Sequence, residues 1–341
     1  MKLINALGIV SKCVPKNDLI KSLSYILFNN GKVVGYNGAQ AVIVKSKEVR
    51  GLTCAIPANI SIPLFKSFGS ANVELSCKGS ALVVACGKTK AKLVTIPIND
   101  FIFSEKSLPV EGEFLELGSE FLDALDDCSK TIDDKEITNR CGIYLVTENN
   151  KTVMYSSDGL NISRYRFDNS IVDIPVMLPD LFCQMLLVNR HYFENSSLLI
   201  GDSGIVVKAK GITLYTQITN IDNMPDFEKV WKEYDVGDVN YITVDNDIID
   251  AVERCTIILP QDKKPIELTL ENGVLTMLSE SSYGIMNIPI KVPSKDSSSI
   301  VIDGIYLEPF IKQVSEFAIK QKVIVGNKGN YSRLTAGIIV S

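Results

Sequence analysis

The residue types that perform catalysis are sparse in this chain of 341 residues. It has one histidine, His191, which follows LLVNR at the expected end of a helix. No GxSxG, HExxH, GxGxxG or GxxxxGK[ST] pattern accompanies it. A lone histidine near a helix C-terminus is commonly there because its charge suits the helix dipole. A Cys–His nucleophile assembled by folding stays as the enzymatic alternative, but we expect no catalytic activity.

The eight cysteines contain no CxxC pair and mostly lie among apolar neighbours. This usage is typical of small buried side chains in a reducing cytosol, with a metal site or a disulfide as the alternative. We therefore expect no metal and no cofactor. No apolar stretch approaches the length of a membrane span. The opening MKLINALGIVSKC lacks a small-residue cleavage site and fits a helical stripe better than a signal peptide. We expect a cytoplasmic protein that does not bind membranes.

The net charge of −5 is unevenly distributed along the chain. Residues 1–112 hold 14 lysines and arginines against 6 acidic residues, a net charge of +8; residues 113–232 carry −8, and residues 233–341 carry −5. Random drift of surface charge would give such a pattern without any function. The alternative that we favour is a first domain that faces a polyanion and whose basic surface also meets an acidic surface in an assembly.

The elements that would position these charges recur three times. Four apolar residues at i, i+3, i+4 and i+7 predict one helical face, and this spacing occurs near the start, middle and end of the chain. The three sets are Ala6, Ile9, Val10 and Cys13; Phe121, Ala124, Leu125 and Cys128; and Ile248, Ala251, Val252 and Cys255. Each is followed by a strand, a polar turn and, as a β-hairpin, a second strand. Three copies of one domain are thus predicted, with boundaries at 1–112, 113–232 and 233–341.

Each copy is also expected to contain a second helix followed by further strands. We place these helices at Ile62–Phe68, with Pro63 in its first turn, at the segment LPDLFCQMLLVNRHYF, and at Ile305–Lys320. Ser119 and Asp245 are the expected N-caps of the first helices of the second and third copies. Linkers are expected at Ser104–Gly112 and Val230–Val239. The plan is α+β, with two helices on one face of antiparallel sheet in every copy.

Three stretches resemble the bacterial DNA polymerase III beta subunit, the sliding clamp, and the short chain suggests a phage-type member. They are IPANISIPLFKSFG with VELSCKGSALVVACGKTKAKLVTIP, TVMYSSDGLNIS, and NMPDFEKV, and they occur in the order typical of that family. The resemblance covers essentially the whole chain. It implies a head-to-tail homodimer that forms a six-domain ring, with helices lining the hole and sheets forming the wall. Phe101, Ile257 and Ile258 match the apolar subunit contact of the family, although ordinary core packing would also explain them.

The resemblance implies a processivity factor that encircles duplex DNA without sequence specificity and touches phosphates weakly enough to slide. Lys16 and Asn17 fall on the DNA-touching loop of the family, and Lys88, Lys90 and Lys92 alternate so that they share a sheet face. The full set of candidate DNA contacts is Lys12, Lys16, Asn17, Lys66, Lys88, Lys90, Lys92, Lys130 and Lys135. A single lysine is more often just a solvated surface charge, and only the clustering in the first domain favours DNA contact. The acidic first helices of the second and third domains predict that DNA leans toward the first domains.

The same resemblance implies an apolar pocket between the second and third domains that holds short peptides of the replicative polymerase, the clamp loader and other clients. The matching residues are Arg140, Ser157, Gly159, Leu160, Asn161, Ile162, Pro225, Lys229, Val230, Gly337, Ile338, Ile339 and Val340. Asp158-Gly159 also predicts a simple turn, and Leu160 and Ile162 could instead belong to a core strand. The Leu160-Asn161 pair replaces a basic pair of the family, and the GIIVS tail lacks its methionine-proline-methionine ending.

A β-rich structural protein of tandem domains, for instance in a virion, is the competing interpretation. It would not encircle DNA. The two interpretations differ in whether linearising a circular DNA releases the protein.

Overall fold

The structure is a computed structural model of the chain. It describes residues 1–15, 18–69, 71–132, 141–172, 175–218, 221, 224–234, 240–260, 264–294 and 296–338. Six of the predicted site residues lie outside this part of the chain: Lys16, Asn17, Lys135, Arg140, Ile339 and Val340.

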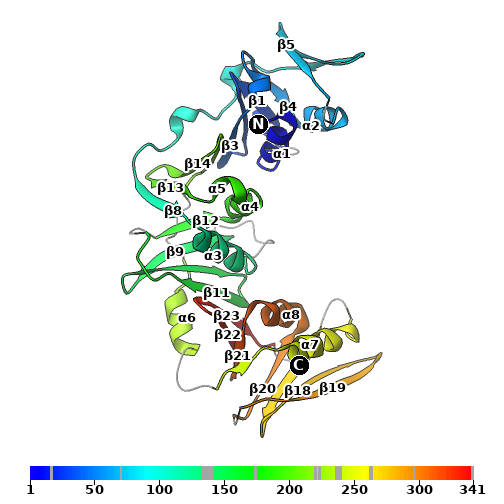
Figure 1. The fold of residues 1–341 in the computed structure, drawn as a ribbon, viewed down its shortest axis with the longest axis vertical. Coiled ribbons are helices and arrows are strands. Elements are labelled where there is room, and N and C mark those ends of the chain that lie inside the picture. The colour runs from blue at the N-terminus through cyan, green and yellow to red at the C-terminus, as the bar shows by residue number, and fades with distance from the viewer. Residues whose placement is uncertain are drawn as a thin grey trace. The chain divides into compact units, whose positions relative to one another are not determined.

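The chain folds as two compact units (Figure 1). Unit 1 contains residues 1–122 and 181–219, and unit 2 contains residues 123–180 and 220–341. The predicted second domain, residues 113–232, is thus divided between the two units. The boundaries of the units therefore differ from the predicted domain boundaries. The division into three domains at 112/113 and 232/233 stays a prediction.

A helix followed by three antiparallel strands occurs six times in the described residues, twice in each predicted copy. The first set in each copy is α1 (Leu3–Val10) with β1–β3, α3 (Ser119–Ser129) with β9–β11, and α7 (Asn246–Ile257) with β17–β19. The second set is α2 (Ala58–Ser67) with β5–β7, α4 (Asp180–Val188) with β13–β15, and α8 (Gly304–Gln313) with β21–β23. The predicted repeat is therefore itself a pair of related halves.

Unit 1 holds one sheet of eight strands in the order β4-β1-β2-β3-β15-β14-β13-β8 and one of three in the order β5-β6-β7. Their bounds are β1 Tyr25–Asn29, β2 Lys32–Tyr36, β3 Gln40–Lys45, β4 Thr53–Pro57, β5 Glu74–Lys78, β6 Ala81–Cys86, β7 Thr89–Val94, β8 Glu113–Leu117, β13 Ser196–Gly201, β14 Gly204–Ala209 and β15 Ile212–Thr216. Helix α1 packs on β2 and β3 beside α2. It comes so close that a Cβ at Gly35 would lie 2.6 Å from Val10 Cγ1. Phe101 and Phe103, just before the first linker, belong to another buried cluster of this sheet.

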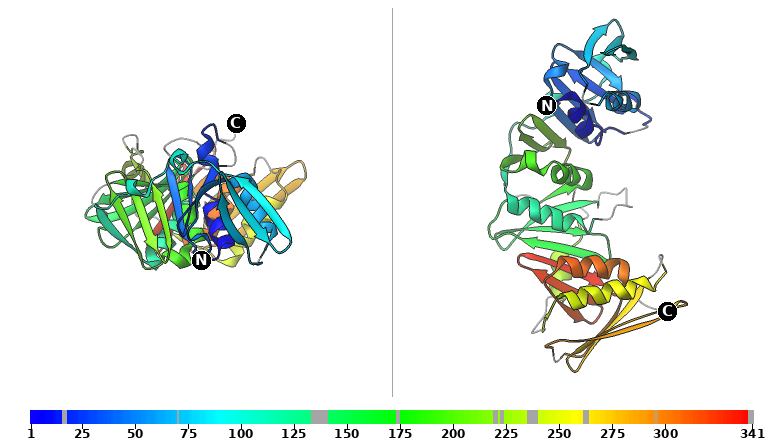
Figure 2. Two further views of the ribbon diagram at one scale, coloured as in Figure 1. Left: turned by 90° about the horizontal axis from the view of Figure 1, so that it is seen from above. Right: turned by 45° about the vertical axis from the view of Figure 1, so that its right-hand side comes forward.

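Unit 2 repeats this strand order in its eight-stranded sheet, β12-β9-β10-β11-β23-β22-β21-β16, and adds a sheet of four, β19-β18-β17-β20. The bounds are β9 Gly142–Glu148, β10 Lys151–Ser157, β11 Asn161–Arg166, β12 Val176–Pro179, β16 Ile242–Thr243, β17 Pro265–Glu271, β18 Val274–Ser281, β19 Gly284–Lys291, β20 Ser298–Asp303, β21 Glu316–Lys320, β22 Val323–Lys328 and β23 Tyr331–Ala336. Helices α7 and α8 lie side by side (Figure 2). Helix α6 (Phe227–Tyr234) begins before the second predicted linker, and its Phe227 and Trp231 are buried against the eight-stranded sheet.

The apolar stripes predicted for the helices are buried in α3 and α7, and Asp245 caps α7 by accepting a hydrogen bond from the Ile248 N–H (3.0 Å). Four helix boundaries were wrong. Helix α1 ends at Val10, before Cys13; Ser119 is the first residue of α3 instead of its cap; and α2 begins at Ala58, which places Pro63 inside the helix. The predicted helix Ile305–Lys320 is α8 followed by β21, because the segment Glu316–Lys320 pairs with β22 and its first two residues also pair with β16.

Two other segments differ from the predicted helices and linkers. The second helix of the middle copy breaks at Asn189 into α4 and the short α5 (Arg190–Phe193). The predicted linker Val230–Val239 overlaps α6. The first linker contains one short 3₁₀ turn, Glu105–Ser107. Similar turns occur earlier in the chain at Lys21–Ser24, Lys47–Val49 and Ile98–Asp100.

Candidate nucleic-acid and peptide-binding surfaces

Two of the candidate DNA contacts lie on the helical layer of unit 1. Lys12 is exposed in the turn that follows α1, and Lys66 is exposed in the last turn of α2. Lys66 also lines a groove of about 450 Å³ between the two helices, together with Val14, Ile62 and Pro63. A duplex lying against these helices would meet amines in a position to contact phosphates.

Lys88, Lys90 and Lys92 form a separate group on the three-stranded sheet. All three are exposed, and the predicted shared face is confirmed for Lys90 and Lys92 of β7, whereas Lys88 lies in the turn before that strand. Because β7 is the edge of its sheet, these amines border an unpaired strand. The structure does not bring them together with Lys12 and Lys66 on the helices.

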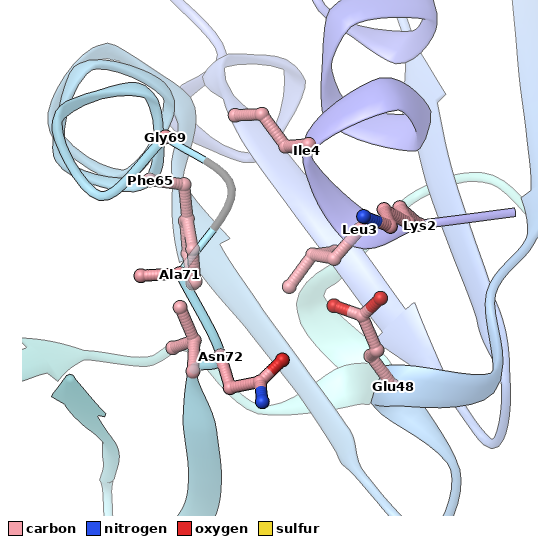
Figure 3. A pocket seen from close by; sticks show the side chains of 9 residues that line it. Lys2, Leu3, Ile4, Glu48, Phe65, Gly69, Ala71 and Asn72 are labelled. Carbon is pink, nitrogen blue, oxygen red and sulfur yellow. The ribbon is translucent and has the colours of Figure 1, made fainter.

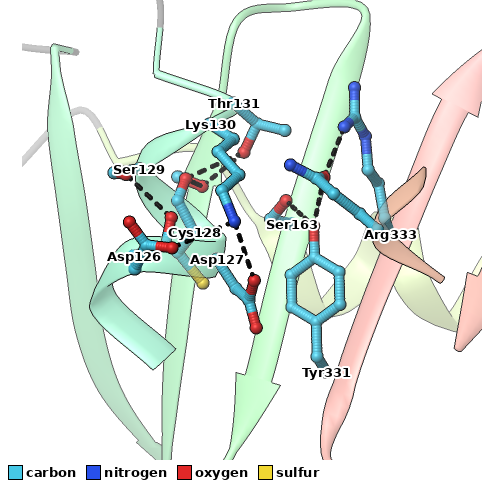
Figure 4. Close-up of polar contacts among 11 residues, drawn as sticks. Asp126, Asp127, Cys128, Ser129, Lys130, Thr131, Ser163, Tyr331 and Arg333 are labelled. Atoms are coloured by element: carbon cyan, nitrogen blue, oxygen red, sulfur yellow. Dashed lines mark hydrogen bonds and ion pairs between the residues drawn. The ribbon is translucent and has the colours of Figure 1, made fainter. Parts of the chain in front are cut away.

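Lys130 has partners within its own helical turn. Its Nζ lies 3.0 Å from Asp126 Oδ2 and 3.1 Å from Asp127 Oδ1 (Figure 4). Partial burial lowers the pKa of the amine, but the hydrogen bonds to these two carboxylates outweigh it and raise the pKa overall. Its charge is thus already matched inside the chain, which weakens the case for Lys130 as a phosphate contact.

The acidic face predicted for α7 is also partly compensated. Glu253 Oε1 lies 2.7 Å from Lys312 Nζ of α8, and Asp250 Oδ2 lies 3.6 Å from Arg254 Nη2. Lys312 also pairs with Glu308 at 2.8 Å, and the two carboxylates raise the pKa of the amine. Exposed pairs of this kind stabilise the fold little, but they reduce the negative potential that a passing phosphate would meet.

The predicted peptide-binding residues of unit 2 meet around one turn. Strands β10 and β11 are joined by Asp158, Gly159 and Leu160, with Gly159 at φ +89°. Asp158 Oδ1 accepts the N–H groups of Leu160 (2.9 Å) and Asn161 (2.7 Å), and Ser157 Oγ donates to the Asn161 carbonyl (2.8 Å). The turn presents Leu160, whose side chain is 41% exposed.

The C-terminal strand and tail run beside this turn. Strand β11 pairs with β23, and the Ala336 N–H donates to the Leu160 carbonyl (2.9 Å). The following Gly337 and Ile338 donate to the carbonyls of Lys322 and Val301. Unit 2 therefore places Leu160 and the start of the tail next to each other, as a shared binding surface requires.

Helix α6 contributes to the same neighbourhood. Ile162 and Met224 pack against the cluster that contains Phe227, Trp231 and Leu334. Pro225 and Lys229 are exposed at the start of α6, and Val230 is half-buried. Met224 was not predicted from the sequence, although its place immediately before Pro225 in NMPDFEKV was a usable signal.

Asn161 differs from its predicted neighbours because it is fully buried. Its Oδ1 accepts hydrogen bonds from Arg333 Nη2 (3.0 Å) and Thr335 Oγ1 (2.8 Å), and its Nδ2 donates to Asp158 Oδ2 (2.7 Å). Asn161 therefore offers no side-chain surface to a bound peptide.

The three predicted dimer residues have different surroundings. Phe101 is buried in the core cluster of unit 1, while Ile258 is half-buried and Ile257 is 77% exposed. The end of α7 is tied to the β18–β19 turn, because Ser281 Oγ donates to the Ile258 carbonyl (2.6 Å). Two further exposed apolar residues, Tyr283 in that turn and Ile285 at the start of β19, were missed by sequence reasoning. Their alternation in YGIMNIPI was a usable signal.

The remaining chemistry is limited in the described part of the chain. His191 is exposed and lies against the Tyr192 ring, and no cluster of three or more His, Cys, Asp or Glu residues there could hold a metal. Burial raises the pKa of Cys13 to about 12.

A pocket of about 250 Å³ at the start of α1 is lined by Lys2, Glu48 and Asn72 among others, and contains none of the predicted site residues (Figure 3). None of the described helices has the length and apolar character needed to cross a membrane.

Solved structures match this fold over nearly the whole chain. The DNA polymerase III beta subunit of Pseudomonas aeruginosa aligns with 99% of this chain and 98% of its own, with a TM-score of 0.83 and 16% identity. The Caulobacter crescentus pol III beta gives the same coverage, a TM-score of 0.84 and 20% identity, and the Thermotoga maritima beta subunit gives 100% and 98% coverage, 0.84 and 16%. No family model and no curated protein sequence matches the chain. The fold predicted from the resemblance, that of the beta sliding clamp, is confirmed.

Proposed function

We propose that this protein is a DNA sliding clamp, a non-enzymatic processivity factor that closes around duplex DNA in the cytoplasm. The observation that carries the proposal is an incomplete sheet. In both eight-stranded sheets, the third strand of one half-repeat pairs with the third strand of another: β3 with β15 in unit 1, and β11 with β23 in unit 2.

The two smaller sheets are the two parts of a third sheet of this type. Their third strands, β7 and β19, are the only ones of the six that end a sheet among the described residues. Antiparallel pairing of β19 with β7 of another chain would give the seven-strand order β20-β17-β18-β19-β7-β6-β5, which matches the first seven strands of the two eight-stranded sheets. Two chains joined head to tail in this way form two identical junctions and close a ring.

The side chains near both edges suit such a junction. Strand β7 carries Lys90 and Lys92 and the exposed Val94, while the β18–β19 turn and the end of α7 expose Tyr283, Ile285 and Ile257. Apolar contact at the centre with complementary charge around it is the usual composition of a stable interface. The first predicted domain carries +8 and the third −5, so the charges favour the head-to-tail arrangement. We therefore assign Lys88, Lys90 and Lys92 to the junction instead of the DNA surface.

The helical layer is the proposed DNA surface, with Lys12 and Lys66 as its described contacts and Lys16, Asn17 and Lys135 as further predicted ones. Sequence-independent contacts to phosphates supply weak, salt-dependent affinity and allow sliding. The ion pairs of Lys130, Glu253 and Asp250 leave α3 and α7 less negative than the sequence predicts, so the expected lean of DNA toward the first domains is reduced.

We further propose that clients, the replicative polymerase and clamp loader among them, bind through short peptides at the surface formed by Leu160, Ile162, Pro225, Val230 and the C-terminal tail. The Pseudomonas aeruginosa clamp has been solved bound to griselimycin, and the Caulobacter crescentus clamp with a polyethylene glycol at a putative beta-motif tethering region. Replacing Leu160 by alanine and deleting residues 338–341 should each abolish griselimycin binding without unfolding the chain. Unchanged affinity would mean that the pocket is elsewhere.

Retention on DNA of different topology tests the proposed function. After loading onto a nicked circular plasmid, a closed ring should stay bound at 1 M salt and dissociate when a restriction enzyme cuts the circle. Salt-sensitive binding that ignores linearisation would identify an ordinary DNA-binding protein, and no binding would favour a tandem-domain structural protein. The mass in solution, measured by light scattering, should be that of a dimer.

A further inference from the structure

Arg333 is a buried cation at the seam between β11 and β23. Its side chain is 2% exposed, and its guanidinium carbon lies 5.9 Å from the centre of the Phe310 ring. Nη1 donates to Gln313 Oε1 at the end of α8 (2.6 Å), and Nη2 donates to Asn161 Oδ1 (3.0 Å). Both partners are neutral amides. A buried charge is costly unless a counter-charge or good hydrogen bonds compensate it.

Asn161 links this cation to the nearest carboxylate. While its Oδ1 faces Arg333, its Nδ2 donates to Asp158 Oδ2 (2.7 Å). The amide thus makes two hydrogen bonds to charged groups, which are stronger than bonds between neutral groups. The result is a continuous path from Asp158 through Asn161 and Arg333 to Gln313, whose Oε1 also accepts a hydrogen bond from the Tyr331 hydroxyl (3.1 Å).

Asp158 in turn shapes the segment that presents Leu160. With one carboxylate oxygen held by Asn161, the other is available to accept the N–H groups of Leu160 and Asn161. Only a side chain with both a donor and an acceptor can serve this path. A carboxylate at position 161 would lack the donor and repel Asp158, and a basic side chain would place a second cation beside Arg333.

We infer that Asn161 is a positioning residue, which holds the Asp158–Leu160 turn against β23 and so sets the place of Leu160 in the peptide-binding surface. The inference rests on the proposed peptide site. It also gives a physical reason for an asparagine, instead of a basic residue, next to Leu160.

Hydrogen exchange of the turn tests the positioning directly, without any ligand. In Asn161→Ala, the backbone amides of positions 160 and 161 should exchange at least ten-fold faster than in the wild type under native conditions. Thr152→Val is the matched control, because Thr152 is equally buried in unit 2 and its Oγ1 also accepts two hydrogen bonds, from the N–H groups of Ile171 (2.7 Å) and Val172 (3.1 Å). It should destabilise the unit but leave exchange in the turn unchanged. Equal acceleration in both variants would mean that Asn161 acts only on overall stability.

Binding of griselimycin, followed by calorimetry, tests the consequence. Asn161→Ala should weaken affinity at least ten-fold and Thr152→Val less than two-fold, while Leu160→Ala should abolish binding without accelerating exchange. Faster exchange with unchanged affinity in Asn161→Ala would overturn the positioning role. A wild-type protein that binds no griselimycin would contradict the proposed peptide site instead, and the exchange rates would still decide whether Asn161 holds the turn.

Discussion

Glu148 is a half-buried carboxyl at the end of β9, and its Oε1 accepts a hydrogen bond from the Tyr155 hydroxyl (2.9 Å). Burial raises the pKa of Glu148. The hydrogen bond from Tyr155 lowers this pKa, and the negative charge of Glu228 in α6 raises it further. A carboxyl whose pKa is raised by folding contributes stability below its unfolded value, and this stability is lost as the pH rises through the folded value. We expect Glu148→Gln to raise the melting temperature at pH 7.5, where the wild-type side chain is ionised. The gain should vanish by pH 4.

Thermal unfolding followed by circular dichroism at the two pH values checks this expectation. Glu116→Gln, on an exposed side chain of β8, is the control and should leave the melting temperature unchanged at both. A Glu148→Gln variant that melts lower at pH 7.5 would mean that the bond from Tyr155 to an ionised carboxylate outweighs the cost of burial.

The linker that enters β8 depends on Gly112. Its φ is +146°, and a Cβ added there would lie 1.9 Å from the Ile200 carbonyl oxygen. Because both the backbone conformation and the contact exclude a side chain, Gly112→Ala should lower the free energy of unfolding by about 2 kcal/mol or more. Urea denaturation measures this loss. At Gly118, where nothing lies within 4 Å of an added Cβ, the same substitution should change stability by less than about 1 kcal/mol. Similar losses at both sites would refute the steric argument.

The elements differ in how far local sequence determines them. The stripes of α3 and α7 were predictable because burial follows the helical period within a single segment. Strand β21 was assigned to a helix, since the strands with which Phe317 pairs, β16 and β22, lie elsewhere in the chain and do not appear in the local pattern. The same limit applies to the site: Leu160 could be identified from a turn signal, but the burial of Asn161 depends on Arg333, 172 residues later.

For the whole molecule, the proposed ring depends on the junction that completes the third sheet. Ile257 is exposed at the end of α7, so replacing it by aspartate should leave the fold of the chain intact and place a charge in an apolar contact. We expect Ile257→Asp to shift the mass in light scattering from dimer to monomer at micromolar concentration. Val188→Asp, which changes an apolar residue that is 59% exposed at the end of α4, should remain dimeric. A dimeric Ile257→Asp variant would place the subunit contact elsewhere.

The positive charge of the first 112 residues is divided between two surfaces with separate proposed tasks, and paired substitutions can distinguish them. Lys12 and Lys66 lie on the helical layer, whereas Lys90 and Lys92 lie on the edge strand β7. Removing one lysine that neutralises a phosphate reduces the slope of log affinity against log salt by about 0.9. We therefore expect the double variant Lys12→Ala, Lys66→Ala to reduce this slope by about 2 per chain on a short duplex, measured by fluorescence anisotropy, with its dimeric mass unchanged. The double variant Lys90→Ala, Lys92→Ala should leave the slope nearly unchanged and weaken the dimer instead. Equal reductions of the slope in both variants would mean that Lys90 and Lys92 contact DNA and do not belong to the junction.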